Sequence, residues 1–261
     1  MKPDQPERFN VLGIGVHAID MSDALRIMES AIREGRKGYI CVTGVHGIME
    51  AQRDPELRSI LNQSLLTTPD GMPAVWVGRL QGFRDVLRVY GPDLMIDFCT
   101  ATAASGFRHF LYGGQPGVAE ELADKLQARI PGLNIVGTFT PPFRPLNPEE
   151  EEQLRSLVAS TKPDVIWVGL STPKQETFMA SHLEGMDVKV MVGVGAAFDI
   201  HTGRIKDAPA WVKRSGLQWL HRLCQEPGRL WKRYLVNNPL FLLKITGQLM
   251  GLKRYPPPPR R

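Results

Sequence analysis

Residues 164–170 (DVIWVGL) and 189–194 (KVMVGV) are almost continuously apolar. Runs of this length are typical of parallel strands that are buried on both faces. From residue 9 to about residue 200 such runs alternate with helix-like ones: strands are expected at 9–16, 39–45, 65–68, 108–112, 134–138, 164–170 and 189–194, and helices at 22–35, 49–62, 92–104, 118–130 and 148–160. This alternation predicts an α/β fold, a Rossmann-like, mostly parallel sheet with helices on both faces.

The last part of the chain differs from the rest in charge. Residues 204–261 contain 13 Lys and Arg but only 2 Asp and Glu, while the whole chain has a net charge of +5, so residues 1–203 are net acidic. Two helices are expected here, at 208–224 and 227–247, and they carry Trp211, Trp219 and Trp231. We predict a Rossmann-like body at 1–203, a basic, Trp-rich helical appendage at 204–252 and a disordered Pro/Arg tail at 253–261.

The mixture of aromatic rings and cations in the appendage suits an anionic membrane surface, where rings lie at headgroup depth and cations meet lipid phosphates. Two other interpretations stay open. The appendage could dock on the body with a solvated basic face, or it could bind nucleic acid, although no known DNA- or RNA-reading motif is present. We expect a membrane surface as partner and no nucleic acid. The apolar patch at 239–252 is too interrupted to span a bilayer.

Several common kinds of site lack their motifs. Cys41, Cys99 and Cys224 show no C-x-x-C spacing, which argues against a zinc site or a disulfide framework and fits buried thiols in a reducing cytoplasm. No D-x-D triplet or paired-histidine spacing supports a metal-dependent phosphate site, and no G-x-S-x-G elbow supports a serine hydrolase. GIGVHA (13–18) fits the dinucleotide pattern G-x-G-x-x-A, but we discount it because strand-like alternation continues through it. No metal or cofactor is predicted.

Polar and glycine residues gather where the predicted strands end, which is the edge at which open parallel sheets bind ligands. The strand ends are VTGVH (42–46), TPDGMP (68–73), LYGGQ (111–115), GLSTPKQE (169–176) and GVGAAFD (193–199), and the candidate residues among them include Asp70, Gly113, Gly114, Gly193 and Gly195. The glycines of GGQ (113–115) would let backbone N–H groups approach a phosphate at a helix N-terminus. The turn is not a Walker loop, because no Gly-Lys-Ser/Thr follows it.

Asp70 stands out among these residues because it lies between a proline and a glycine at a predicted strand-to-helix turn. A carboxylate in that place can reach a substrate hydroxyl and act as a general base. The structural alternative is an Asx turn or a helix N-cap, for which Pro-Asp-Gly is well suited. Local sequence alone favours that alternative.

Several segments taken together resemble the WecG/TagA/CpsF family of glycosyltransferases, which build bacterial surface polysaccharides and wall teichoic acid. The segments are EAQRDPEL (50–57), TPDG (68–71), RVYGPDL (88–94), GLSTPKQE (169–176), GVGAAFD (193–199), GLQWLHRL (216–223), QEP (225–227) and RLW (229–231). They cover about residues 40–235 in the family's order. Their joint occurrence is highly specific, although each piece alone is not.

The resemblance implies an inverting, metal-independent hexosyltransferase that moves a sugar from a UDP-sugar to a polyprenyl-diphosphate-linked sugar in exopolysaccharide or cell-surface glycan synthesis. It places Asp70 on the family's proposed catalytic base, and Thr43, Arg88 and Gln175 on its pocket positions. Arg222 and Arg229 fall on tail arginines thought to close over the active site and contact the diphosphate. The resemblance also implies work at a membrane, so we expect a cytoplasmic protein, peripheral on the inner face of the bacterial cytoplasmic membrane.

One position departs from the family pattern: Val45 stands where the family usually has an asparagine, and His46 follows it. Either His46 takes the polar role or the acceptor is handled differently. A nucleotide- or NAD-binding regulatory module that docks on membranes stays an alternative, as does an enzyme of this fold with a soluble acceptor. The sequence identifies neither the donor sugar nor the acceptor linkage, and a homo-oligomer is left open.

Overall fold

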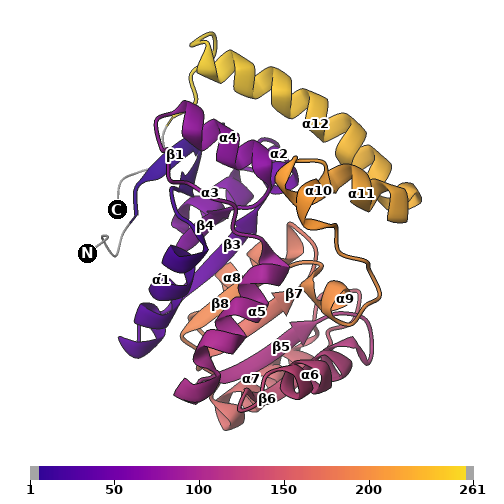
Figure 1. The fold of residues 1–261 in the computed structure, drawn as a ribbon. Coiled ribbons are helices and arrows are strands. Elements are labelled where there is room, and N and C mark those ends of the chain that lie inside the picture. The colour runs from indigo at the N-terminus through magenta and orange to yellow at the C-terminus, as the bar shows by residue number, and fades with distance from the viewer. Residues whose placement is uncertain (1–5, 257–261) are drawn as a thin grey trace. The chain divides into compact units, whose positions relative to one another are not determined.

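The computed structural model describes residues 6–256 (Figure 1). Its strands are β1 (Arg8–Val11), β2 (Ile14–His17), β3 (Gly38–Thr43), β4 (Leu66–Pro69), β5 (Arg108–Gly113), β6 (Asn134–Phe139), β7 (Val165–Gly169) and β8 (Val190–Gly193). Its α-helices are α1 (Met21–Arg33), α2 (Val45–Glu50), α3 (Pro55–Gln63), α4 (Met72–Leu80), α5 (Gly91–Thr102), α6 (Val118–Arg129), α7 (Pro148–Thr161), α8 (Lys174–His182), α9 (Ala197–His201), α10 (Ala210–Arg214), α11 (Gln218–Gln225) and α12 (Pro227–Leu249). From residue 257 onward, the predicted disordered tail lies outside the described residues.

The described strands form a six-stranded sheet in the order β4-β3-β8-β7-β5-β6 and a separate two-stranded sheet, β1-β2. β7 pairs in parallel with β5 and with β8, and β5 pairs in parallel with β6. Every residue of β8 is buried, as is every residue of β7 except Gly169. Because successive side chains of a strand point to opposite faces, both faces of this part of the sheet are covered. The predicted α/β, Rossmann-like fold class is confirmed.

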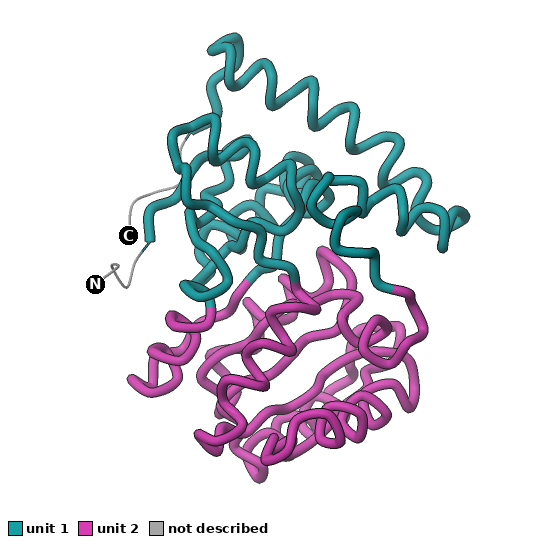
Figure 2. The backbone as a smooth tube through the Cα atoms, in the orientation of Figure 1, with its two compact units in different colours: residues 1–24, 41–90, 207–261 teal, residues 25–40, 91–206 magenta. Residues whose placement is uncertain are grey.

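The chain forms two compact units (Figure 2). Unit 1 comprises residues 1–24, 41–90 and 207–261, and unit 2 comprises residues 25–40 and 91–206. The chain enters unit 1 for the last time at Asp207, close to the predicted boundary at residue 203. That the basic appendage is a domain of its own stays a prediction.

Unit 2 contains the parallel strands β5 to β8 and the helices that pack on them. α6 contacts β5 and β6, α7 contacts β6, and α8 contacts β7 and β8. Trp167 is fully buried on β7 and donates through Nε1 to Nδ1 of His109 at 3.1 Å. Burial lowers the pKa of His109 to about 4, so this ring is a neutral part of the core. α7 begins with a capping box formed by Asn147 and Glu150.

Unit 1 begins with a hairpin rather than with the single strand predicted over 9–16. β1 and β2 pair antiparallel, with Arg8 opposite His17. The chain reverses at Leu12 (φ 53°) and Gly13 (φ 85°), both in the left-handed region. The prediction was wrong because apolar alternation continues on both sides of this tight turn. Gly13 therefore lies in a hairpin, not at the strand-to-helix turn that a dinucleotide fingerprint requires.

Two predicted helices are interrupted. The helix expected to run to Asn62 is divided into α2 and α3, because Asp54 caps a new helix by accepting from Glu56 N (2.9 Å) and Leu57 N (3.1 Å), and Pro55 takes its first position. The helix expected at 208–224 is divided into α10 and α11 around Gly216, whose φ is 77°. Glycine tolerates this left-handed conformation far better than other residues do.

The long C-terminal helix α12 has a buried face and a separate, exposed apolar stripe. Leu230, Asn237, Phe241 and Ile245 are buried, and the helix packs against α2. The apolar stripe, at spacings of four, seven and seven residues, is exposed: Trp231 (47%), Leu235 (55%), Leu242 (61%) and Leu249 (40%). Within residues 6–256, no helix combines the length and apolar character needed to cross a bilayer.

Candidate active site

Asp70 lies in unit 1 at the turn between β4 and α4. Its backbone N–H donates to Thr43 O at 3.2 Å and to Thr68 O at 3.0 Å, which fixes the turn beside the end of β3. The N-cap residue of α4 is Gly71 (φ 87°), so Asp70 does not hold the N-cap position that local sequence favoured. The Asp70 side chain is 29% exposed.

Thr43 and Gly44 approach this turn closely. A Cβ atom added to Gly44 would lie 3.2 Å from Asp70 O, a tight approach to the backbone carbonyl, and 3.7 Å from Asp70 Oδ2, an ordinary contact with the carboxylate. Thr43 is buried, and its hydroxyl donates to Cys41 O at 3.3 Å. The structure thus brings the predicted residues Thr43 and Asp70 together at adjacent strand ends.

Arg88 is the cation next to Asp70. Its Nε lies 3.7 Å from Asp70 Oδ1, which is an ion-pair distance but too long for a hydrogen bond. Its Nη2 donates to Oε1 of Gln218 in α11, and its guanidinium carbon lies 4.1 Å from the centroid of the Tyr90 ring. The Arg88 side chain is 11% exposed, and its Nε has no hydrogen-bond partner among the described residues.

The buried ring of Tyr90 contacts two cations. Lys213 Nζ lies 4.9 Å from the centroid of its ring, in addition to the Arg88 guanidinium. The Tyr90 hydroxyl donates to Asp207 Oδ1 at 3.3 Å, and Asp207 also pairs with Lys213. Burial first, then the Asp207 and Asp70 carboxylates, raises the pKa of Tyr90 far above its usual value, against the influence of Arg88 and Arg222. Tyr90 is therefore a neutral phenol at any working pH.

The predicted tail arginines share one carboxylate. Arg222 Nη2 donates to Glu226 Oε2 at 2.7 Å, and Arg229 donates through Nε (2.8 Å) and Nη2 (2.6 Å) to Glu226 Oε1. The Arg222 side chain is 12% exposed and its Nε has no hydrogen-bond partner in the described part of the chain, whereas Arg229 is 55% exposed. The two guanidinium groups are thus held side by side by one acceptor.

Arg233 belongs to the same cluster, and the sequence did not single it out. Its Nε is buried and, within residues 6–256, has no hydrogen-bond partner. Burial, together with the charges of Arg229 and Arg222, lowers its pKa, while Asp70 and the neighbouring Tyr234 act in the opposite direction. The cluster therefore contains more positive than negative side chains. Its four arginines are Arg88, Arg222, Arg229 and Arg233, and its two carboxylates are Asp70 and Glu226. Buried N–H donors with excess positive charge are what an anionic ligand requires.

His46 lies at the start of α2, where α12 packs. Its Nδ1 is 3.4 Å from Nδ2 of the buried Asn237 and 3.7 Å from Glu50 Oε1. Arg53 donates to the other end of the Asn237 amide, at 3.2 Å. His46 is therefore a polar contact between α2 and the appendage, as well as a neighbour of the Thr43 strand end.

The remaining predicted residues lie in unit 2. Gln175 is buried: its Oε1 accepts from Gly195 N, and its Nε2 donates to Glu176 Oε1, both at 3.0 Å. A Cβ at Gly193 would lie 3.0 Å from the Gln175 amide carbon. Gln175, Gly193 and Gly195 thus form one strand-end cluster. The buried carboxylate of Glu176, which also accepts from Thr172 at 2.9 Å, was not expected from the sequence.

Gly113 and Gly114 follow β5, also in unit 2. Gly113 has φ 126°, and a Cβ there would lie 2.6 Å from Gly169 O. A Cβ at Gly114 would lie 3.0 Å from the Val118 side chain, at the start of α6. The close approach of β7 and α6 is enough to require glycines here, so their predicted contact with a phosphate stays a prediction.

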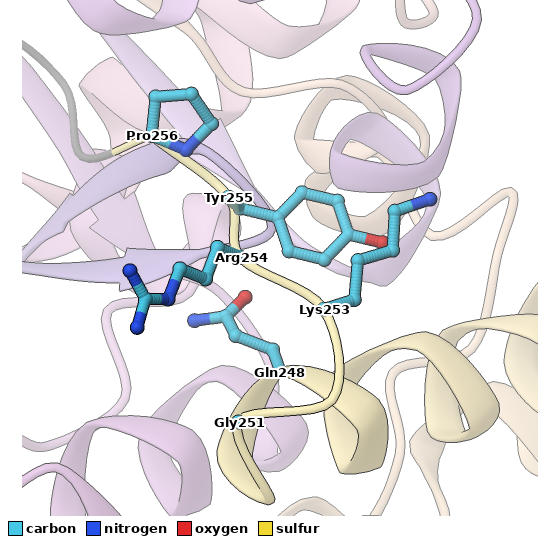
Figure 3. A pocket seen from close by; sticks show the side chains of 6 residues that line it. All are labelled: Gln248, Gly251, Lys253, Arg254, Tyr255 and Pro256. Carbon is cyan, nitrogen blue, oxygen red and sulfur yellow. The ribbon is translucent and has the colours of Figure 1, made fainter.

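A surface pocket lies elsewhere in unit 1, at the C-terminal end of α12 (Figure 3). It is lined by Gln248, Gly251, Lys253, Arg254, Tyr255 and Pro256. Gln248 fastens α12 to the β1–β2 hairpin, since its Oε1 accepts from Leu12 N and its Nε2 donates to Asn10 O, both at 2.7 Å. None of the predicted site residues lines this pocket.

Comparison with known proteins agrees with the resemblance. The model of the "Glycosyl transferase WecG/TagA/CpsF family" matches residues 9–255. The N-acetylglucosaminyldiphosphoundecaprenol N-acetyl-beta-D-mannosaminyltransferase of Bacillus subtilis (strain 168) is 28% identical over 211 residues, 81% of this chain and 80% of that protein. The protein of the same name from Bacillus spizizenii is 29% identical over 209 residues, 80% of this chain and 79% of that protein. The chain therefore belongs to the WecG/TagA/CpsF family and is a glycosyltransferase of the hexosyl-transferring kind.

Proposed function

We propose that this enzyme transfers a sugar, with inversion and without a divalent ion, from a UDP-sugar to a polyprenyl-diphosphate-linked sugar in the synthesis of exopolysaccharide or another cell-surface glycan. The observation that carries the proposal is the position of the Asp70 carboxylate beside a cluster of partly unsatisfied arginines in unit 1. The names of the two Bacillus relatives suggest the substrate class: N-acetylglucosaminyl-diphospho-undecaprenol as acceptor and an N-acetylmannosaminyl group as the sugar transferred.

The proposed reaction is a single displacement. Asp70 takes the proton of the acceptor hydroxyl while the hydroxyl oxygen forms a bond to C1 of the donor sugar. The bond from C1 to the diphosphate oxygen breaks on the opposite face, and UDP leaves with the electron pair. The backbone of Thr43 fixes the turn that carries Asp70, Arg88 supplies positive charge beside the carboxylate, and His46 offers a polar group to the sugar.

The leaving diphosphate needs positive charge. We assign this role to Arg222 and Arg229, with Arg233 as a third candidate, because planar guanidinium groups bind phosphate oxygens through paired hydrogen bonds. Electrostatic stabilisation of this kind usually contributes more to the rate than any other effect when an enzyme expels an anion. In unit 2, Gly113, Gly114, Gln175, Gly193 and Gly195 are proposed as the strand-end residues that contact the nucleotide sugar.

The direct test is a panel of UDP-sugars offered with a synthetic N-acetylglucosaminyl-diphospho-lipid, with products read by mass spectrometry. We expect transfer of one sugar from one donor, UDP-N-acetylmannosamine being the first to try, with the anomeric configuration of the product inverted. If no UDP-sugar is transferred to a diphospholipid acceptor, the proposal fails. Transfer to a soluble sugar acceptor with equal efficiency would favour the alternative of an enzyme without a lipid substrate.

We also propose that α12 lies on an anionic membrane, at the inner face of the bacterial cytoplasmic membrane. The exposed stripe of Trp231, Leu235, Leu242 and Leu249 adjoins Lys232, and such a helix buries its apolar face at headgroup depth while its cations meet lipid phosphates. Leu235→Glu with Leu242→Glu should abolish flotation with vesicles that contain phosphatidylglycerol. Phe143→Glu, at a 79% exposed apolar side chain of unit 2, is the matched control and should float like the parent protein. Unchanged flotation of the double variant would refute the attachment.

A further inference from the structure

Gln218 and Tyr90 hold Arg88 in place, and nothing in the proposed reaction assigns them a role. Gln218 is the first residue of α11, in the basic C-terminal part of the chain, and its Oε1 accepts from Arg88 Nη2. The guanidinium carbon of Arg88 lies over the Tyr90 ring, 4.1 Å from its centroid. Arg88 is thereby held by a hydrogen bond and by a cation–π contact.

The support under Tyr90 also comes from the C-terminal part of the chain. Asp207 accepts from the Tyr90 hydroxyl at 3.3 Å and from Ala208 N at 2.8 Å, and it pairs with Lys213. Lys213 covers the Tyr90 ring at 4.9 Å. Residues 207–218 therefore supply the hydrogen-bond acceptor of the Tyr90 hydroxyl and the only hydrogen-bond acceptor that the structure gives to Arg88 within the described chain.

The result of these contacts is the 3.7 Å separation between Arg88 Nε and Asp70 Oδ1. An arginine free to rotate closes on a carboxylate with two hydrogen bonds of about 2.7–2.9 Å. Such a pair would occupy the carboxylate and weaken it as a base, since an opposite charge in contact favours the ionised form. Arg88 is instead directed to Gln218 and kept about 1 Å short of that contact.

We propose that Gln218 is a positioning residue: from the C-terminal appendage it holds Arg88 away from Asp70, with Tyr90 as the supporting surface, and so maintains the carboxylate as a base. This inference rests on the proposed role of Asp70. Asp70 can then act as an effective base only when residues 207–218 are docked correctly. The side chain of Gln218 thus connects the appendage to the proposed reaction.

Several charged and titratable groups lie near Asp70, and a test must separate the position of Arg88 from the effects of their charges on the pKa of Asp70. Arg88 Nε lies 3.7 Å from the carboxylate, and the charge of Asp70 also acts on Tyr90 and Arg233. Arg222, Asp207 and Lys213 act on or contact Tyr90 in turn. Substitutions at Gln218 change the position of Arg88 without removing one of these charges.

Two variants of Gln218 should act in opposite directions on Asp70. Gln218→Leu removes the acceptor, so Arg88 closes on Asp70 and the pKa of Asp70 falls by about one unit. Gln218→Glu pairs with Arg88 and offsets its charge, so the pKa of Asp70 rises. The measurement is a ¹³C NMR titration of protein labelled at the aspartate carboxyl carbon, with the Asp70 resonance identified by its loss in Asp70→Asn. The acid limb of the kcat/KM profile should move in the same direction as the NMR value in each variant.

Gln225→Glu, on the exposed end of the same helix, is the matched control and should leave the Asp70 titration unchanged. Tyr90→Phe keeps the ring beneath Arg88 and should titrate like the parent protein, whereas Tyr90→Leu should behave like Gln218→Leu. Shifts of equal sign in both Gln218 variants, or no shift in either, would overturn the inference. Full turnover in Asp70→Asn would instead overturn the proposed function, while opposite NMR shifts would still establish how Arg88 is positioned.

Discussion

Replacement of Asp70 by Asn tests the proposed mechanism most directly, because it removes the proton acceptor and changes the side chain's shape very little. Positioned general-base catalysis contributes typically about 10²–10⁴-fold. We therefore expect Asp70→Asn to lower kcat by at least 100-fold, which corresponds to about 3 kcal/mol or more in activation free energy. A loss of this size with an unchanged KM for the donor would identify an interaction made in the transition state.

The effect of the same change on stability is expected to be small. At 3.7 Å the gross attraction between Asp70 and Arg88 is about 4 kcal/mol with an effective dielectric constant of about 20. Because the Asp70 side chain is 29% exposed, solvent screening and desolvation reduce the net contribution to roughly 1 kcal/mol. The variant should therefore remain folded, and a loss of turnover can be assigned to chemistry.

The assay is UDP release with the donor and acceptor that the panel identifies, together with thermal unfolding in the presence of UDP. UDP at 100 times its Kd should stabilise the parent protein and Asp70→Asn equally, by about 2.7 kcal/mol. Asp85→Asn, an exposed carboxylate in the same unit, is the control and should turn over normally. Turnover of Asp70→Asn within threefold of the parent protein would eliminate Asp70 as the base.

Three further predictions concern the proposed diphosphate-binding arginine Arg222, the proposed independence from metal ions, and the buried histidines. Arg222→Lys should lower kcat/KM by about 10- to 100-fold despite its equal charge, because an ammonium cannot reproduce the guanidinium fork, while Arg214→Lys on the exposed side of α10 should not; equal kinetics of the two would contradict the diphosphate role. Incubation with EDTA followed by assay in metal-free buffer should leave turnover unchanged, and loss of activity that Mg²⁺ restores would contradict the metal-independent mechanism. Burial lowers the pKa of His17 to about 3 and that of His109 to about 4, so both are neutral in the folded protein at pH 5 but protonated in the unfolded chain. Stability measured in urea should therefore fall by about 2 kcal/mol per histidine between pH 7 and pH 5, and a flat profile would show that these rings are protonated in the fold.

The sequence predicted the parallel sheet well because its signal is local. A strand such as β7 is buried on both faces, and four of its five residues are large and apolar, so a few consecutive residues are enough to recognise it. The interruptions were harder to predict, although each has a local cause: the left-handed pair Leu12 and Gly13, the Asp54 cap with Pro55, and Gly216. In each case apolar periodicity continued across the break and was given more weight than the turn residue.

The candidate site was predictable only in part, and for a different reason. Asp70 was found because it stands at a strand end between a proline and a glycine, a feature that one stretch of sequence reveals, whereas Thr43 was indicated by the resemblance to the family. Gln218 is 130 positions from the arginine that it contacts, and an amide at the start of an amphipathic helix carries no signal by itself. Arg233 looked like one more cation in a basic helix until its buried, unsatisfied Nε distinguished it from the exposed Arg229.

A carboxylate base among arginines faces a conflict, because every cation that binds the leaving diphosphate also stabilises the ionised base and weakens it. The structure separates the two tasks by giving most cations another partner: Glu226 binds Arg222 and Arg229, Asp207 binds Lys213, and Gln218 with Tyr90 occupies Arg88. A diphosphate carries more charge than one carboxylate and can take Arg222 and Arg229 over from Glu226. We therefore expect the arginines to exchange partners when donor binds and to return to Glu226 when UDP leaves, so that Glu226→Gln should bind UDP more tightly, release it more slowly and lower kcat while leaving the chemical step measured in a single turnover unchanged.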